Sequence, residues 1–321
     1  MLLTFLVAGA LLLLVVNRLA WKQAGAMVFI AASGERTSRI KKLSRWRKIL
    51  VLLKGINLPR NENESAPGDF GLEFKVVRFP GLQGRLEGWF IPCPGASQVV
   101  LLFHGYARNK STLLIEALLF HRMGCACLMV DFPGAGGSQG RQVTLGFYEA
   151  VDVMQAATWT RLHHPQLRQV LFGHSMGAVA ILTAATRYDL PVAGFILESP
   201  FASLLETVEA RFRAMGIPPF PLTHLLLFWG SLRLRLNGYT HRPIDYAKLV
   251  TMPVLQLHGS NDARVPLARA KALFHNLLGS KTFVEFHQSE HEPLAAKEPL
   301  VWERAVRGFL QSLDEKKSLA A

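Results

Sequence analysis

Short β-rich runs alternate with helical stretches along most of this chain. Eight runs of apolar and β-branched residues are predicted strands: 72–79, 84–91, 98–105, 125–132, 169–175, 192–199, 253–259 and 282–288. Stretches with helical periodicity lie between most of them, at 110–122, 143–161, 176–187, 265–278 and 296–313. From the third strand onward, the alternation predicts a mostly parallel sheet with helices on both faces. The first two strands, joined by a short link, are expected to form an antiparallel hairpin at the sheet edge.

One connection is much longer than the others. Residues 201–249, between the sixth and seventh strands, exceed an ordinary loop and contain the apolar run PLTHLLLFWGSLRLRL at 221–236, which is predicted to be helical. Such an insertion could cap a substrate pocket or touch a membrane, and a simple packing helix is the alternative. We expect a globular domain over 61–321, which begins with a polar linker at 61–71 and carries this cap insertion at 201–249.

The chain begins with sixteen residues that carry no charged side chain. A helix over residues 2–16 would be about 22 Å long, which is shorter than a hydrocarbon core of about 30 Å. Extension to Trp21 closes this gap, because Arg18 can reach the headgroups and Trp21 suits the interface. We therefore expect residues 1–22 to be a single transmembrane anchor. A cleaved signal peptide is the alternative, since residues 24–26 (Ala-Gly-Ala) resemble a cleavage site, although no basic residue precedes the apolar run.

Positive charge is concentrated directly after this segment. The chain has a net charge of +13, and residues 33–60 contain nine Lys or Arg and one acid. With Arg18 and Lys22 also set aside, residues 61–321 carry only +3, which argues against a nucleic-acid partner. Within 39–54, apolar residues recur at helical spacing among seven basic residues. We expect residues 33–60 to form a basic amphipathic juxtamembrane segment on an anionic membrane surface; a solvated helix packed on the protein is the alternative.

The same charge pattern predicts an orientation. Because the positive charge follows the anchor, the C-terminal bulk of the chain is expected on the cytoplasmic side. A cleaved signal peptide would instead make the protein secreted or periplasmic.

The stretch FGHSMGAVA, at 172–180, places Ser175 between Gly173 and Gly177. This spacing is a weak signal alone, but it falls where the fifth predicted strand ends and a helix begins. A sharp strand-to-helix turn needs small neighbours, and it would expose the serine hydroxyl at a helix N-terminus that favours negative charge. We expect Gly173 and Gly177 to support such a turn. A hydroxyl is a weak nucleophile, so a base must lie within reach.

An acid and a histidine follow at the ends of later strands. Asp262 lies just after the seventh strand and His291 just after the eighth, where open parallel sheets build their sites. The order Ser175, Asp262, His291 is one of the known orders of a catalytic triad. Glu198, after the sixth strand, is the alternative acid.

The segment HGYARN, at 104–109, follows the third strand. We expect the backbone N–H groups of Tyr106 and Met176 to form an oxyanion hole. His104 and Asp131 are expected to order their loops and not to catalyse. The three cysteines, Cys93, Cys125 and Cys127, lack the spacing of a disulfide framework or a zinc site, so no metal is expected.

Five segments together resemble the α/β-hydrolase superfamily over about residues 72–313: HGYARN, DFPGAGGSQG (131–140), GHSMGA, HGSNDARVP and SEHEPL. The segment ILESPFAS, at 195–202, resembles the branch that contains membrane-associated lipases, acyl-protein thioesterases and aminopeptidase-like hydrolases. This resemblance implies an eight-stranded α/β-hydrolase fold over a catalytic domain and an esterase-type activity without a cofactor. It implies no particular substrate. The N-terminal anchor and its basic segment are a departure from the minimal family core.

The residues and the resemblance lead to one functional expectation. The chain is expected to be a serine hydrolase that cleaves carboxylic esters or thioesters of a lipid or acyl type, through an acyl-enzyme intermediate. Its expected partners are a small acyl substrate and membrane lipid. The alternatives are a serine peptidase or aminopeptidase-like amide hydrolase and a non-catalytic scaffold at the membrane.

Overall fold

The computed structural model describes residues 1–31, 33–37 and 44–320, and the chain divides into two compact units. The smaller unit contains Met1–Arg60 and Leu204–His241, and the larger contains Asn61–Ser203 and Arg242–Ala321. The N-terminal segment and most of the 201–249 insertion therefore fold together, although they are far apart in the sequence.

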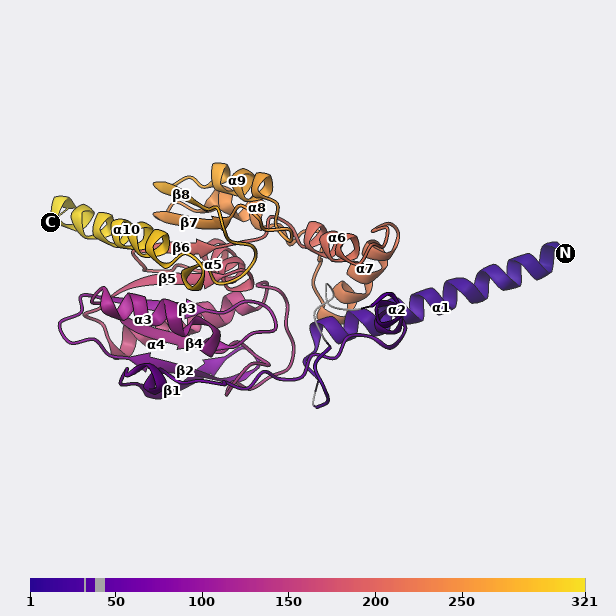
Figure 1. The fold of residues 1–321 in the computed structure, drawn as a ribbon, viewed down its shortest axis with the longest axis horizontal. Helices are drawn as coiled ribbons and strands as arrows, with labels where there is room; N and C mark the ends of the chain where they lie inside the picture. The colour runs from indigo at the N-terminus through magenta and orange to yellow at the C-terminus, as the bar shows by residue number, and fades with distance from the viewer. Residues whose placement is uncertain (32, 38–43, 321) are drawn as a thin grey trace. The chain divides into compact units, whose positions relative to one another are not determined.

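The larger unit is built on an eight-stranded sheet with the order β1-β2-β4-β3-β5-β6-β7-β8 (Figure 1). Its strands are β1 Lys75–Gly81, β2 Gly84–Ile91, β3 Gln98–Phe103, β4 Ala126–Val130, β5 Arg168–His174, β6 Gly194–Glu198, β7 Val254–Gly259 and β8 Lys281–Phe286. Strands β3 to β8 are parallel to one another, whereas β2 is antiparallel to both of its neighbours, β1 and β4. The expected mostly parallel sheet with an edge hairpin is confirmed.

Helices cover both faces of this sheet, as expected. They are α3 Leu114–Arg122, α4 Glu149–His163, α5 Met176–Arg187, α8 Pro243–Tyr246, α9 Leu267–Asn276 and α10 Pro299–Ala320. Side chains alternate along a strand, so residues of β5 that are an odd number of positions apart point to opposite faces of the sheet. Gln169 and Phe172 therefore show which helices cover each face. Phe172 packs edge-to-face with Phe120 of α3 and Trp302 of α10, whereas the amide of Gln169 bonds the Ala157 carbonyl of α4 at 3.0 Å on the opposite face. The central strands are thus buried on both sides.

The described part of the smaller unit contains four helices: α1 Leu2–Val28, α2 Arg45–Lys54, α6 Leu204–Ala214 and α7 Leu222–Leu234. Helix α7 packs on α1 and α6, and α2 packs on α1. Helix α1 continues to Val28, beyond the segment 1–22 expected as the anchor. Of the residues 39–54 that showed helical spacing, Arg45–Lys54 form α2. Residues 39–43 lie outside the described residues.

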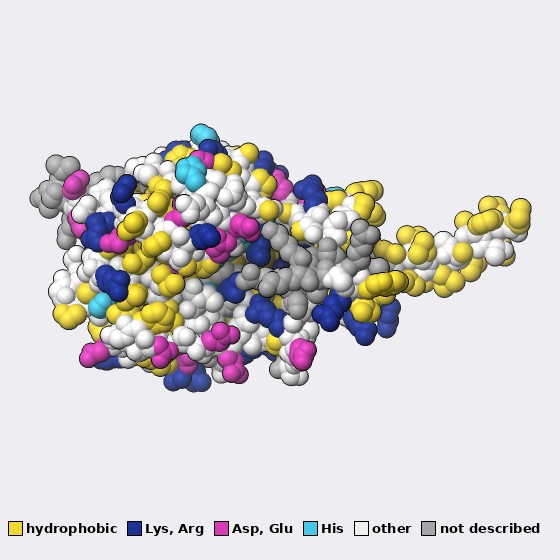
Figure 2. All heavy atoms as spheres, in the orientation of Figure 1, with side chains coloured by type: hydrophobic (Ala, Val, Ile, Leu, Met, Phe, Trp, Pro, Cys, Tyr) yellow, Lys and Arg dark blue, Asp and Glu magenta, His cyan; other side chains and the backbone are white. Residues whose placement is uncertain are grey.

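Helix α1 is long and apolar. Its 27 residues include an 18-residue window with a mean hydropathy of 2.2, none of which is buried, and it alone among the described helices is long and apolar enough to cross a membrane. Hydrophobic side chains cover its N-terminal half (Figure 2). Length and composition of this kind also occur in signal sequences.

A buried carboxyl group makes the stability of the larger unit depend on pH. Asp152 of α4 lies inside the fold, and its Oδ1 accepts a hydrogen bond from the Leu82 amide at 2.9 Å. Burial, with a smaller contribution from Glu149, raises the pKa of Asp152 from 3.8 to about 7. Between these two values the folded state holds a proton that the unfolded chain has released, so this group's contribution to stability falls as the pH rises.

We expect Asp152→Asn to remove this pH dependence, because the Asn carbonyl can still accept from the Leu82 amide. Relative to the variant, the parent protein should lose about 2 to 3 kcal/mol of unfolding free energy between pH 5 and pH 8. Urea unfolding of the full chain in detergent micelles measures this loss. The exposed Asp189→Asn is the matched control, and parallel pH profiles for parent and Asp152→Asn would contradict the expectation.

Candidate active site

Ser175 occupies a sharp turn between β5 and α5. Its backbone has φ +53° and ψ −109°, a conformation that costs a non-glycine residue on the order of 1–3 kcal/mol. A Cβ atom at Gly177 would lie 2.1 Å from the Phe103 carbonyl oxygen, and one at Gly173 would lie 2.4 Å from the Ala178 nitrogen. Both positions therefore admit glycine alone, which is the physical reason for the spacing around Ser175.

The structure brings Ser175, His291 and Asp262 together. The Ser175 Oγ lies 2.9 Å from the His291 Nε2, and the His291 Nδ1 lies 2.6 Å from the Asp262 Oδ2. Asp262 follows β7 and His291 follows β8, and these two strands pair side by side. A Cβ at Gly259 would lie 2.4 Å from the Glu290 carbonyl oxygen, so glycine at the end of β7 lets the two loops approach each other.

The surroundings hold the acid ionised and the histidine neutral. Burial opposes the charge of Asp262, but hydrogen bonds from His291 and from the Val265 amide, the latter at 2.9 Å, bring its pKa below the ordinary value. The Arg264 amide also donates to the Asp262 Oδ1, at 2.8 Å. Burial also lowers the pKa of His291, against the opposing effect of Asp262. Since Nδ1 faces a carboxylate and donates to it, Nε2 is left to accept from the Ser175 hydroxyl. This arrangement can move a proton from serine to imidazole.

The loop after β3 passes directly beside Ser175. A Cβ at Gly105 would lie 3.6 Å from the Ser175 Cβ, and Tyr106 follows at once. Met176, the other expected oxyanion donor, is the first residue of α5. The two expected N–H groups thus belong to the two backbone segments that meet at Ser175.

His104 orders this loop, as expected. Its Nε2 accepts from the Phe132 amide at 3.0 Å, which leaves its Nδ1 as the donor to the Gly105 carbonyl at 2.8 Å. Burial lowers the pKa of His104, which favours this neutral tautomer. The imidazole therefore ties the loop after β3 to the loop after β4.

Glu198, the alternative acid, does not contact His291. This fully buried carboxylate accepts from the His174 Nδ1 at 2.9 Å, the Leu294 amide at 3.2 Å and the Trp302 indole at 3.1 Å. The Leu294 amide belongs to the segment that follows His291. Glu198 thus fixes the position of the histidine loop against β5 and α10.

Lys110 is a buried charge that the sequence did not single out. Its ammonium is completely buried, forms an ion pair with Asp131 and lies 3.2 Å from the Glu87 Oε1. The Lys110 amide also donates to the Asp131 Oδ1 at 2.8 Å, and the Gly137 amide to its Oδ2 at 3.1 Å. The expectation that Asp131 orders its loop is confirmed. The sequence did not predict its ion pair with Lys110, because the two residues meet only when β3 and β4 lie side by side in the sheet.

The polar linker after Arg60 also reaches these loops. Asn61 donates to the Ala107 carbonyl at 2.6 Å, and Asn63 donates to the Asp131 Oδ2 at 3.1 Å. Asn109 donates in turn to the Glu62 carbonyl at 2.6 Å. The segment expected as a polar linker therefore helps to hold the loop after β3 in place.

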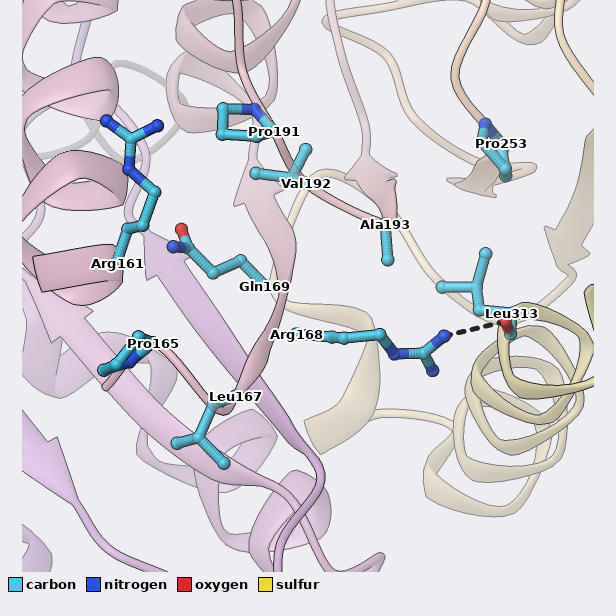
Figure 3. Close-up of a pocket in the computed structure, with 10 residues that line it drawn as sticks. All are labelled: Arg161, Pro165, Leu167, Arg168, Gln169, Pro191, Val192, Ala193, Pro253 and Leu313. Atoms are coloured by element: carbon cyan, nitrogen blue, oxygen red, sulfur yellow. Dashed lines mark hydrogen bonds between the residues drawn. The ribbon is translucent and has the colours of Figure 1, made fainter. Parts of the chain in front are cut away.

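A surface pocket of about 530 Å³ lies elsewhere in the larger unit (Figure 3). Arg168 and Gln169, at the start of β5, line it, and Arg168 donates to the Leu313 carbonyl at 3.0 Å. Ser175 follows the C-terminal end of the same strand, so this pocket lies at the N-terminal ends of the strands, away from Ser175. Within the residues that the structure describes, no group of three or more His, Cys, Asp or Glu could hold a metal ion.

Comparisons with known proteins identify the family and the fold of this chain. The family model described as "Serine aminopeptidase, S33" matches residues 94–234. The uncharacterized protein Rv2307c of Mycobacterium tuberculosis is 31% identical over 232 residues, which cover 70% of this chain and 75% of that protein. The human α/β hydrolase domain-containing protein 17C is 28% identical over 192 residues, covering 59% of this chain and 52% of its own length.

Among solved structures, the esterase Pf2001 of Pyrococcus furiosus superposes with a TM-score of 0.68 at 21% identity, covering 80% of this chain and 97% of the esterase. At that identity the superposition shows the fold alone. The sequence relatives and the shared sheet architecture support a general hydrolase activity, and the chain belongs to the α/β-hydrolase superfamily.

Proposed function

We propose that this protein is a membrane-anchored serine hydrolase that cleaves carboxylic esters or thioesters by acyl transfer. The observation that carries the proposal is the relay from the Ser175 Oγ to the His291 Nε2 at 2.9 Å, and from the His291 Nδ1 to Asp262 at 2.6 Å. Its serine is held at φ +53° on a turn that only glycine neighbours permit.

In the proposed reaction, Ser175 attacks the substrate carbonyl while His291 takes the hydroxyl proton. Asp262 holds the imidazole and stabilises the imidazolium that forms. The N–H groups of Tyr106 and Met176 stabilise the oxyanion, and each such donor is worth about 3 to 4 kcal/mol of barrier. His291 then gives the proton to the departing alcohol or thiol, which leaves an acyl-serine. Water attacks this ester with His291 as the base, and the acid product and the free serine result.

The anchor supports an acyl substrate. Helix α1 is long and apolar enough to span a bilayer, and residues 33–60 carry nine basic side chains that favour an anionic surface. A hydrolase held at a membrane works where acyl lipids and acylated proteins are concentrated. We therefore propose acyl esters or thioesters as the substrate class and membrane lipid as the partner of α1.

A peptidase activity is the second candidate, because the matching family model is described as a serine aminopeptidase. Comparison of p-nitrophenyl esters of increasing chain length with amino-acid p-nitroanilides separates the two. Higher kcat/KM on the esters supports the proposal, and higher kcat/KM on the anilides supports the peptidase.

We expect Ser175→Ala to lose hydrolysis of short p-nitrophenyl esters by at least about 1,000-fold and to lose labelling by a fluorophosphonate probe. The matched control is Ser312→Ala on α10, whose hydroxyl donates to the nearby Phe309 carbonyl at 2.7 Å. Parent-like hydrolysis by Ser175→Ala would refute the proposal. Absence of probe labelling in the parent protein would favour a non-catalytic scaffold.

The activity should depend on pH through His291. Because burial lowers the pKa of this histidine below its usual 6.5, the imidazole is neutral and able to accept a proton at pH 7. Activity should therefore fall only when the pH drops through the lowered pKa. A profile of kcat/KM between pH 4.5 and 8.5 should show a single acidic limb with an apparent pKa below 6.5. A midpoint above 7 would contradict the assignment.

The orientation is tested by fusions at the C-terminus. Since the basic residues follow α1, we expect the C-terminus on the cytoplasmic side. In a bacterial host, a C-terminal alkaline phosphatase should then be inactive and a C-terminal green fluorescent protein should be fluorescent. The reverse result would place the larger unit outside.

A further inference from the structure

Helix α7 of the insertion runs beside α1 in the same direction. The Trp229 ring packs edge-to-face on Trp21 at 5.2 Å, and its indole N–H donates to the Asn17 Oδ1 at 3.2 Å. One turn later, the Arg233 guanidinium lies 3.5 Å over the Trp21 ring. It fills the space that the absent side chain of Gly25 leaves open, since a Cβ there would lie 2.9 Å from the Arg233 Cζ. Later residues of α7 thus meet later residues of α1.

The length of α1 fixes the depth of this contact, if α1 spans a bilayer as proposed. Residues 1–15 are all exposed, and coverage of α1 by its own unit begins at Val16. The uncharged run of α1 ends at Arg18, and Trp21 and Lys22 follow within one turn, as is typical of the end of a membrane span. The cytoplasmic interface then falls near Trp21, so the contacts of Trp229 with Asn17 and Trp21 lie within the membrane.

The composition of α7 suits this depth. Residues 220–232 contain no Asp, Glu, Lys or Arg, and Arg233 comes level with Trp21. Phe220, Phe228 and Leu232 are 76%, 53% and 58% exposed, which is unfavourable in water and favourable in lipid. Tryptophans at the interface and an arginine that reaches toward the headgroups are typical of membrane helix ends.

Helix α2 presents a second apolar stripe nearby. Trp46, Leu50 and Leu53 lie on one helical face and are 78%, 48% and 50% exposed. The Gln23 side-chain amide donates to the Val51 carbonyl at 2.6 Å, which attaches α2 to α1 just past Trp21. Arg47 and Lys54 are exposed on the same helix. A helix with apolar residues on one face and basic residues beside it suits the headgroup layer of an anionic bilayer.

We propose that the insertion is a membrane-embedded part of the anchor. Helix α7 enters the cytoplasmic leaflet beside α1, and α2 lies in the headgroup layer, so that Phe220, Phe228 and Leu232 contact phospholipid. The inference rests on the proposed spanning by α1 and extends it to a segment that lies between β6 and β7 in the sequence. It also requires α1 to be retained, because cleavage after Ala26 would remove Asn17 and Trp21, the partners of Trp229.

Fluorescence quenching in vesicles tests this placement. The full chain with Cys93→Ser leaves only the buried Cys125 and Cys127 and is reconstituted in phosphatidylcholine and phosphatidylglycerol. A single cysteine at Phe228, or at Phe220 as a second position, carries an environment-sensitive fluorophore. We expect blue-shifted emission, loss of fluorescence with nitroxide-labelled phospholipid, and protection from aqueous iodide.

Two matched positions make the result decisive. Leu11→Cys on α1 reports spanning by the anchor, and Leu162→Cys on α4 is an equally apolar residue, 71% exposed, that should be quenched by iodide alone. The inference would be overturned if labels at positions 220 and 228 were quenched by iodide alone, as at position 162, while the label at position 11 was quenched by the nitroxide lipid. That result would still support the spanning of the membrane by α1. Lack of lipid quenching at 11 would overturn both. Fluorophosphonate labelling of each variant tests the catalytic proposal independently and shows that the larger unit is intact.

Discussion

The tight approach of α5 to β3 is the constraint on which the larger unit depends. With Gly177 against the Phe103 carbonyl and Gly173 against the backbone of α5, the helix starts immediately after the strand. The strained backbone of Ser175 is held on both sides, because its amide donates to the Glu198 carbonyl at 2.7 Å and its carbonyl accepts from the Val179 amide at 3.1 Å. The turn lies at the centre of the sheet, where the loops after β3, β7 and β8 converge on the hydroxyl.

Buried charges then fix the loops that converge there. Glu198 bonds the segment after His291, and Asp131 with Lys110 bonds the loops after β3 and β4. Removing one member of a buried ion pair typically costs about 3–5 kcal/mol, because the remaining charge stays unpaired. Networks of this kind hold side chains in one geometry, and the proposed proton transfer from Ser175 needs that geometry before substrate arrives.

The smaller unit differs from the larger one in which side chains it exposes. Its helices α1, α2 and α7 expose apolar side chains that water disfavours, and the basic residues Arg47 and Lys54 are exposed on α2 beside them. The aromatic contact between Trp21 and Trp229 joins the N-terminal helix to an insertion about 200 residues further along the chain. An anchor and an insertion that pack together in this way share one environment, which is why the proposed spanning by α1 determines where α7 lies.

The sequence by itself determined the sheet, the turn at Ser175 and the strand ends that carry Asp262 and His291. These follow from local periodicity, glycine spacing and the rule that parallel strands present their carboxyl ends at one edge. Only the tertiary structure decided that Asp262 and not Glu198 contacts His291, that Lys110 pairs with Asp131, and that Asn61 bonds the loop after β3. It also decided that α7 packs on α1. Each of these contacts joins segments whose proximity depends on strand order and helix packing, which no local pattern encodes.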